Sequence, residues 1–231
     1  MENVVRLLST LALMGAVRHL AARFETKTGI RIDADFAPTI GLLERLRKGE
    51  GADVVILTKE ALGDLAAKGT VAAESCADLA RSFVGIAVKA GAAHPDISTE
   101  AKLRTALLGA RSVAYSRIGA SGIFFASLIE QMGIAAEINA RANITAGFTA
   151  ERLVDGTADI AIQQLSELKQ VAGAELVGPL PLHLQNNPAV FSAGRMAASQ
   201  RLRQSDALLK FLASPDVAPA LRESGLEPEP A

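Results

Sequence analysis

Hydroxyl and glycine residues stand at three places where a strand is expected to give way to a helix. They are Ser9 and Thr10, then Thr39, and then Ser121 with Gly122. The first turn of a helix carries unpaired N–H groups and a partial positive charge, so it binds anions without a charged side chain. Ser and Thr are also the common helix N-caps, and capping alone is the alternative. Three such turns together favour an anion-binding site.

Two arginines and a glutamine pair extend this set. Arg81 and Arg117 offer planar guanidinium groups that match a carboxylate with two parallel hydrogen bonds. The alternative for Arg81 is a surface arginine at the entrance of a strand. Gln163 and Gln164 each carry an amide donor and an amide acceptor. Because side chains alternate along a strand, we expect only one of the two glutamines to face a ligand.

The composition excludes several other kinds of partner and site. Lys plus Arg number 24 and Asp plus Glu 25, so no basic excess exists to bind nucleic acid. The chain has no Trp and one Tyr, which argues against a stacking platform for bases or sugars. The single Cys76 cannot form an internal disulfide, and His19, His94 and His183 lack metal-ligand spacing. We therefore predict no metal and no cofactor.

A catalytic base is difficult to assign. No Ser-His-Asp, Cys-His or paired-carboxylate arrangement can be assembled from the sequence. Glu167 is the first candidate, although an acidic residue at the start of a helix is more often a partner of the helix dipole. Tyr115 and Glu151 are weaker candidates. The catalytic residues, if the protein has any, stay unassigned.

Hydrophobic patterns predict the elements that position these residues. The first 57 residues read as strand, helix, strand, helix, strand, the pattern of an open parallel sheet. The first helix carries a buried stripe of Leu13, Val17, Leu20 and Phe24 and ends near Gly29. We interpret residues 4–16 as strand and helix rather than a signal peptide, because Glu2 and Arg6 break the charge order of such a peptide.

A second α/β set follows a predicted strand at residues 82–88. Strands are expected at 112–115, 158–162 and 189–194, and helices at 123–132 and 205–212, with a frayed tail at 226–231. Two such sets joined by long strands predict two lobes. The expected fold class is α/β, with a mixed sheet flanked by helices in each lobe.

Several sequence strings occur in the order typical of one protein family. They are FAPT at 36–39, GADVVIL at 51–57, ASGIFF at 120–125 and SPDVA at 214–218. From Arg6 to about Glu227 the chain resembles type II periplasmic solute-binding proteins, and among them the molybdate-binding proteins of ABC transporters. The strings LSTLAL, AIQQLSEL and VFSAG resemble a subgroup of substrate-binding domains that includes aconitate isomerases.

The resemblance implies lobe 1 at residues 1–82 and 190–231, lobe 2 at 83–189, and crossover strands near 81–89 and 190–196. It also implies a ligand cleft between the lobes, a monomer, and a small anionic ligand. The partner it implies is the membrane component of an ABC transporter. The compartment would be the periplasm if a signal peptide has been removed, and otherwise the cytoplasm.

The expected ligand is inferred from the positions where this sequence departs from the family pattern. The family's first-loop serine falls on Ala12 or has moved to Ser9, its ligand tyrosine falls on Gln164, and a hinge asparagine falls on Arg81. Amides and arginines suit an organic di- or tricarboxylate better than a small symmetric oxyanion. We therefore predict a solute-binding protein for such a carboxylate. The alternative is a cofactor-free isomerase of the aconitate isomerase type, which moves a proton across an allylic system.

Overall fold

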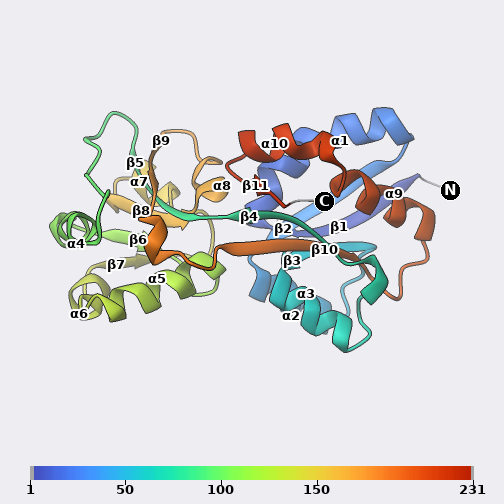
Figure 1. The fold of residues 1–231 in the computed structure, drawn as a ribbon, viewed down its shortest axis with the longest axis horizontal. Coiled ribbons are helices and arrows are strands. Elements are labelled where there is room, and N and C mark those ends of the chain that lie inside the picture. Colours follow the sequence, from blue (N-terminus) through green and yellow to red (C-terminus); the bar gives the residue numbers. More distant parts are fainter. Residues whose placement is uncertain (1–2, 230–231) are drawn as a thin grey trace. The chain divides into compact units, whose positions relative to one another are not determined.

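The computed structural model describes residues 3–229 and divides the chain into two units, each built on its own sheet (Figure 1). Unit 1 comprises the chain up to Ser82 and from Ala189 onward, and unit 2 comprises Phe83–Pro188. The two sheets have six and five strands over the described residues. The predicted fold class, a two-lobed α/β fold with a mixed sheet in each lobe, is confirmed.

The sheet of unit 1 has the strand order β11-β4-β10-β3-β1-β2. β1 pairs in parallel with β2 and β3, whereas β10 runs antiparallel to β3 and β4. The carboxyl ends of β1, β2, β3 and β4 therefore meet at one edge of the sheet. The strands are β1 Val4–Thr10, β2 Arg31–Ala37, β3 Val54–Thr58, β4 Ala77–Ser82, β10 Ala189–Arg195 and β11 Glu227–Pro228.

Helices cover both faces of this sheet, and their buried stripes form its two hydrophobic layers. The predicted stripe Leu13, Val17, Leu20 and Phe24 is buried, and Phe24 packs on Phe211 with ring centroids 5.3 Å apart. Gly29 ends the first helix in the left-handed conformation, as expected. The helices are α1 Met14–Thr28, α2 Thr39–Arg47, α3 Lys59–Ala67, α9 Leu202–Leu212 and α10 Ala218–Glu223, with short 3-10 turns at Leu11–Leu13, Ala73–Ser75 and Pro215–Val217.

The sheet of unit 2 has the strand order β7-β6-β8-β5-β9. β6 pairs in parallel with β7 and β8, so their carboxyl ends also share one edge, while β5 runs antiparallel to β8 and β9. The strands are β5 Val84–Lys89, β6 Val113–Tyr115, β7 Ala142–Ile144, β8 Ile160–Gln164 and β9 Ala174–Pro179. The helices are α4 Glu100–Gly109, α5 Ala120–Gln131, α6 Ala135–Asn139, α7 Glu151–Val154 and α8 Leu165–Leu168, with a 3-10 turn at Leu182–Leu184.

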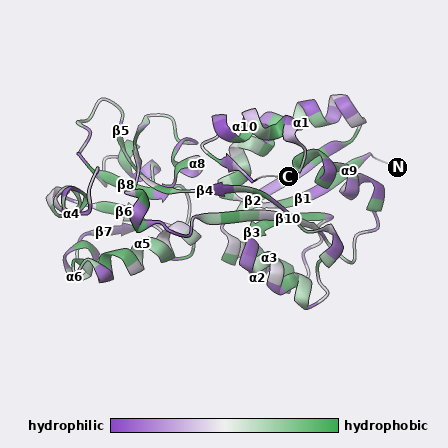
Figure 2. Cartoon of the chain, in the orientation of Figure 1, coloured by the Kyte–Doolittle hydropathy of each residue, from purple (hydrophilic) through white to green (hydrophobic). Residues whose placement is uncertain are grey.

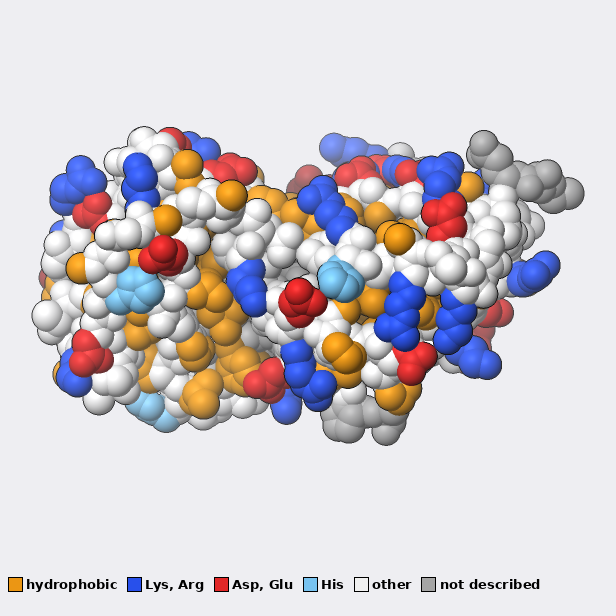
Figure 3. Space-filling model, turned by 90° about the horizontal axis from the view of Figure 1, so that it is seen from above, with side chains coloured by type: hydrophobic (Ala, Val, Ile, Leu, Met, Phe, Trp, Pro, Cys, Tyr) orange, Lys and Arg blue, Asp and Glu red, His pale blue; other side chains and the backbone are white. Residues whose placement is uncertain are grey.

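The hydropathy of the residues agrees with this arrangement of buried strands and covering helices. Figure 2 shows hydrophobic residues concentrated on the strands and hydrophilic residues on the outer faces of helices such as α1 and α9. On the face seen in Figure 3, positive and negative side chains are interspersed, in keeping with the net charge of −1. No helix within residues 3–229 combines the length and the apolar character needed to span a bilayer.

The structure differs from the sequence predictions in three places. The expected strand at 82–88 is two strands, β4 and β5, separated at Phe83, where the chain leaves unit 1. Strands β7 and β9 were not predicted. The prediction of a frayed tail is wrong over the described residues, because Leu226 is buried and Glu227–Pro228 pairs with β4 as strand β11.

Candidate anion-binding site

In unit 1, Thr10 ends strand β1 beside Ala37 of β2. Its side chain is only 3% exposed, yet its hydroxyl oxygen has no hydrogen-bond partner within residues 3–229. A buried hydroxyl without a partner costs about 1–3 kcal/mol, so such groups are few in folded proteins. The neighbouring Ser9 differs, because its hydroxyl donates to the carbonyl of Thr10 over 3.1 Å. Thr10 is thus the free donor of the predicted pair.

The second predicted turn of unit 1 is an uncapped helix start. Thr39 is the first residue of α2, and no side chain caps the helix at Pro38. The first backbone bond runs from Leu42 N to Pro38 O over 3.0 Å, so three N–H groups precede it. The neighbouring helix α3 is capped in the ordinary way, since Thr58 accepts from Ala61 N. Ala37, the last residue of β2, lies one strand spacing, roughly 5 Å, from Thr10, and α2 begins two residues later.

In unit 2, the matching feature is the start of α5. Gly119 is the N-cap residue, and no side chain caps this helix either. The hydroxyl of Ser121 forms no hydrogen bond with any residue in the range 3–229, although Ser121 is only 2% exposed. Arg117 is exposed, and its guanidinium has no ion pair or hydrogen bond within the same range. The α5 terminus thus combines free backbone donors, a free hydroxyl and a free cation.

Gly122 allows this terminus to form. A Cβ atom placed on Gly122 would lie 1.5 Å from the carbonyl oxygen of Ser116, at the end of β6. The first turn of α5 therefore packs directly against the backbone that follows the strand. Gly122 has a steric role that no other residue type can fill without moving this loop.

The two glutamines are both buried at the end of β8, but they make different contacts. Gln163 Oε1 accepts from Thr149 N over 2.8 Å and from the Thr149 hydroxyl over 3.1 Å, and Gln163 Nε2 donates to Gly147 O over 3.2 Å. The Gln164 side chain instead caps α8, in a capping box with Glu167. Their ligand contact stays a prediction, and in this structure both amides are engaged within the protein.

Glu167 lies in the first turn of α8 and is 9% exposed. Its carboxylate accepts from Gln164 N over 3.3 Å, and the nearby Gln163 amide also favours the ionised form. Burial outweighs these bonds and raises the pKa of Glu167 to about 7. The expected dipole partner is therefore present, and it is also an acid that titrates near neutral pH.

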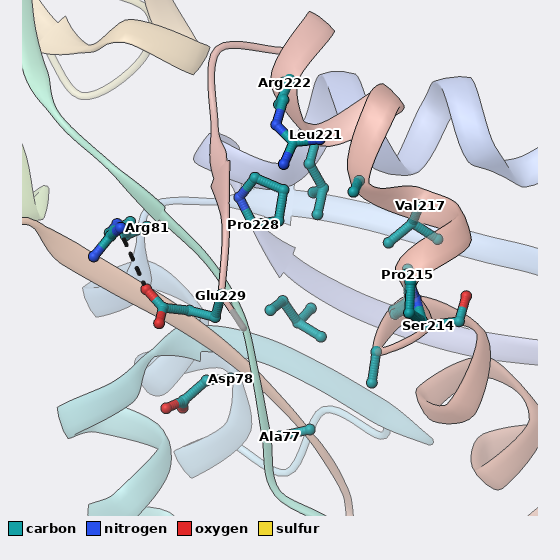
Figure 4. A pocket seen from close by; sticks show the side chains of 14 residues that line it. Ala77, Asp78, Arg81, Ser214, Pro215, Val217, Leu221, Arg222, Pro228 and Glu229 are labelled. Carbon is teal, nitrogen blue, oxygen red and sulfur yellow. Dashed lines mark ion pairs between the residues drawn. The ribbon is translucent and has the colours of Figure 1, made fainter. Parts of the chain in front are cut away.

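Within unit 1, Arg81 lies apart from Thr10. It sits on β4, three strand spacings from β1 in the sheet, or about 14 Å. Its Nε atom lies 3.0 Å from Glu227 Oε2 and 3.9 Å from Glu229 Oε1. Figure 4 shows Arg81 and Glu229 in a pocket of about 750 Å³ that Arg222 and Pro228 also line. A ligand carboxylate at Arg81 would compete with the tail.

The structure adds residues that the sequence predictions missed. Thr149 and Gly147 hold the Gln163 amide, but they follow β7, a three-residue strand too short to recognise from its pattern. Within the described residues no group of His, Cys, Asp or Glu side chains could hold a metal ion. The donors found here are hydroxyls, backbone N–H groups and a guanidinium, which together suit an anion.

Known proteins resemble the chain over nearly its whole length. The family model of the bacterial extracellular solute-binding proteins matches residues 5–227. An aconitate isomerase of Pseudomonas sp is 38% identical over 236 residues, covering 99% of this chain and 89% of that protein.

Solved structures share the fold at low sequence identity. The periplasmic molybdate-binding protein of Azotobacter vinelandii superimposes with a TM-score of 0.83 at 16% identity, over 98% of this chain and 100% of that one. The sulfate-binding protein SubI of Mycobacterium tuberculosis H37Rv gives 0.74 at 14% identity, over 97% and 86%. The predicted resemblance to type II periplasmic solute-binding proteins is confirmed. With this fold and a family match that covers residues 5–227, the chain belongs to the bacterial extracellular solute-binding proteins.

Proposed function

We propose that this protein binds a small organic polycarboxylate, with aconitate as the first candidate. The observation that carries the proposal is the guanidinium of Arg117, which has no partner among residues 3–229 and lies two residues before the N-cap of α5. A helix start alone suits any small anion. A guanidinium adds a planar pair of donors that matches a carboxylate, and this favours an organic acid over a symmetric oxyanion.

The choice of aconitate follows the relative with the higher identity. The Pseudomonas protein that carries this name is 38% identical to the chain, whereas the molybdate and sulfate binders are 16% and 14% identical and support the fold alone. In unit 1, the Thr10 hydroxyl and the N–H groups at the start of α2 are the donors that we propose for the ligand, and we expect their loss to weaken binding as well. Gly122 shapes the α5 turn.

A second candidate function is isomerisation of the bound acid, favoured by the same relative and by Glu167. Moving a double bond along an allylic acid requires a base that removes a proton from one carbon and returns it to another. The reaction consumes no second substrate and changes no oxidation state. A carboxyl group with a pKa of about 7 suits both steps at neutral pH.

As a binding protein, the chain would act as a monomer and deliver its ligand to the membrane component of an ABC transporter. Membership of an extracellular solute-binding family supports this role. As an isomerase it would need no such partner. The two functions therefore differ in whether the ligand leaves the protein unchanged.

The experiment is a thermal-shift and calorimetry screen against molybdate, tungstate, sulfate, citrate, and cis- and trans-aconitate. A ligand that binds the native state raises the melting temperature. Stabilisation by a carboxylate supports the proposal, and stabilisation by molybdate or tungstate alone overturns it. Proton NMR of cis-aconitate incubated with the protein then distinguishes binding from isomerisation. Appearance of trans-aconitate at a rate proportional to protein concentration identifies an enzyme.

A further inference from the structure

Arg18, an exposed arginine of α1, has no partner for its charge within residues 3–229. Its guanidinium forms no ion pair or hydrogen bond with any described residue, and it lies over the ring of Phe36. Arg18 Cζ is 5.6 Å from the centroid of that ring, within the range of a cation–π contact. The ring holds the cation in place and leaves its N–H groups available to a ligand.

The position of Arg18 on α1 directs its side chain toward the carboxyl edge of the unit 1 sheet. Since β1 and β2 are parallel and α1 connects them, α1 runs from this edge back toward the amino ends of the strands. Arg18 is the fifth residue of α1, about 6 Å along the helix axis from Met14. Helical side chains lean toward the N-terminus of their helix, so the guanidinium of Arg18 extends back toward the edge where α1 begins.

The contact with Phe36 agrees with this direction. Phe36 is the last residue but one of β2 and pairs with Ser9, directly before the pair of Thr10 with Ala37. Phe36 packs against the same hydrophobic cluster as α1, so its ring lies on the face of the sheet that α1 covers. The guanidinium of Arg18 is therefore held near the edge where β1 and β2 end, which also carries the start of α2. Ligands of open α/β sheets bind at such an edge.

Arg23 provides a comparison on the same helix. Its Cζ lies 6.0 Å from the centroid of the Phe211 ring, so it also makes a cation–π contact. However, Arg23 Nη1 donates to the Asp216 carbonyl over 2.9 Å, and Nη2 lies 3.5 Å from Asp216 Oδ2. The charge of Arg23 is thus compensated within unit 1. No described acidic side chain pairs with Arg18, and the residues three and four positions away from it along α1 are uncharged.

We propose that Arg18 binds a carboxylate of the ligand and is the carboxylate-binding cation of unit 1, the role that the sequence suggested for Arg81. Arg81 Nε already donates to Glu227 over 3.0 Å, whereas Arg18 has no acceptor among the described residues. The planar donors of Arg18 match a carboxylate with two parallel hydrogen bonds. This inference rests on the proposed function, in which Arg117 is the corresponding cation of unit 2. A requirement for both cations selects acids with at least two carboxylates over acids with one.

The test is calorimetry with trans-aconitate and with three dicarboxylates that each lack one of its carboxylates: itaconate, mesaconate and cis-glutaconate. R18A should bind trans-aconitate about tenfold more weakly than the wild type, because hydrogen bonds between two charged groups are lost. The loss should persist with two of the dicarboxylates and vanish with the third, which lacks the carboxylate that Arg18 binds. R23A is the matched control and should bind all four acids as the wild type does. If R18A proves unstable, R18Q gives the same comparison and keeps most of the side chain against Phe36.

The possible outcomes separate this inference from the proposed function. Equal affinity of R18A and the wild type for trans-aconitate overturns the role of Arg18 and leaves the proposed function standing. A loss of the same size with all four acids also overturns it, because Arg18 would then act through the fold rather than on one carboxylate. If the wild type binds none of the four acids, the proposed function is refuted, and the role of Arg18 is refuted with it.

Discussion

The backbone of Ser116 and the α-carbon of Gly122 are so close that a Cβ on Gly122 would lie 1.5 Å from the Ser116 carbonyl oxygen. This contact fixes the start of α5 against the end of β6. It couples the stability of unit 2 to the geometry of the proposed donors, because the same turn carries Ser121 and follows Arg117.

Gly122→Ala should destabilise the protein and weaken ligand binding together. The added methyl meets backbone rather than a flexible side chain, so the loop must move, at a cost of about 1–3 kcal/mol. Urea unfolding and calorimetry measure the two effects. Gly109→Ala at the end of α4 is the matched control, because a Cβ there meets nothing within 4 Å. A stable G122A variant with full affinity would contradict the close contact.

Arg117→Ala should weaken carboxylate binding without affecting folding. Hydrogen bonds to a charged group contribute about 1.5–3 kcal/mol, which corresponds to a loss of about tenfold to a hundredfold in affinity. The free energy of unfolding should stay within about 0.5 kcal/mol of the wild type, since the side chain has no partner within residues 3–229. Arg203→Ala, at an exposed arginine of α9, should change neither quantity. Unchanged affinity in R117A would remove the main support for a carboxylate ligand.

Thr10→Val should keep or raise stability while lowering affinity. The buried hydroxyl of Thr10 has no partner to lose among the described residues, so replacing it with a methyl group removes an unsatisfied polar atom. Thr58→Val should show the opposite pattern, because the Thr58 hydroxyl caps α3 and its loss costs about 1 kcal/mol. Thermal unfolding and calorimetry on both variants separate the two roles. A clearly destabilised T10V would mean that the Thr10 hydroxyl has a structural partner.

The stability of the wild-type protein should fall as pH rises from about 4.5 to about 7. The folded pKa of Glu167, about 7, lies above its ordinary value of 4.5, so over this range the native state binds more protons than the unfolded state. At pH 8 the cost of burying the charge is about 3 kcal/mol at 1.36 kcal/mol per pKa unit. Urea unfolding at pH 5 and pH 8 measures it. E167Q should lack this pH dependence of the free energy of unfolding. The same fall between pH 5 and pH 8 in both proteins would refute the raised pKa of Glu167.

Local sequence patterns predicted the elements that are long or strongly periodic. The apolar run that begins at Val4 and the stripe from Leu13 to Phe24 identify β1 and α1, because burial on a sheet imposes those periods. The family strings then indicated how such elements assemble. Two short strands could not be predicted in this way. Ala142–Ile144 and Glu227–Pro228 owe their conformation to pairing with β6 and β4, which no local pattern reveals.

The residues of the site could be predicted, but their hydrogen-bond partners could not. Helix starts at Thr39 and near Ser121 were recognised from turn chemistry. Whether a hydroxyl or amide is free depends on residues far along the chain. Gln163 is engaged by Thr149, 14 positions away, and Arg81 by Glu227, 146 positions away. Spacing in sequence carries no information about such pairs, so the free groups could be identified only from the fold.

Strand β11 also covers an edge of β4 that could otherwise pair with another molecule. Without it, β4 would be an edge strand with an unpaired row of backbone groups beside Leu79 and Ala80, a template for another molecule. β11 covers that row and is itself a poor template, because it is two residues long and contains Pro228, which has no N–H to donate. A shortened chain that ends before Glu227 would expose this edge, and its fate in concentrated solution would be aggregation rather than simple loss of stability.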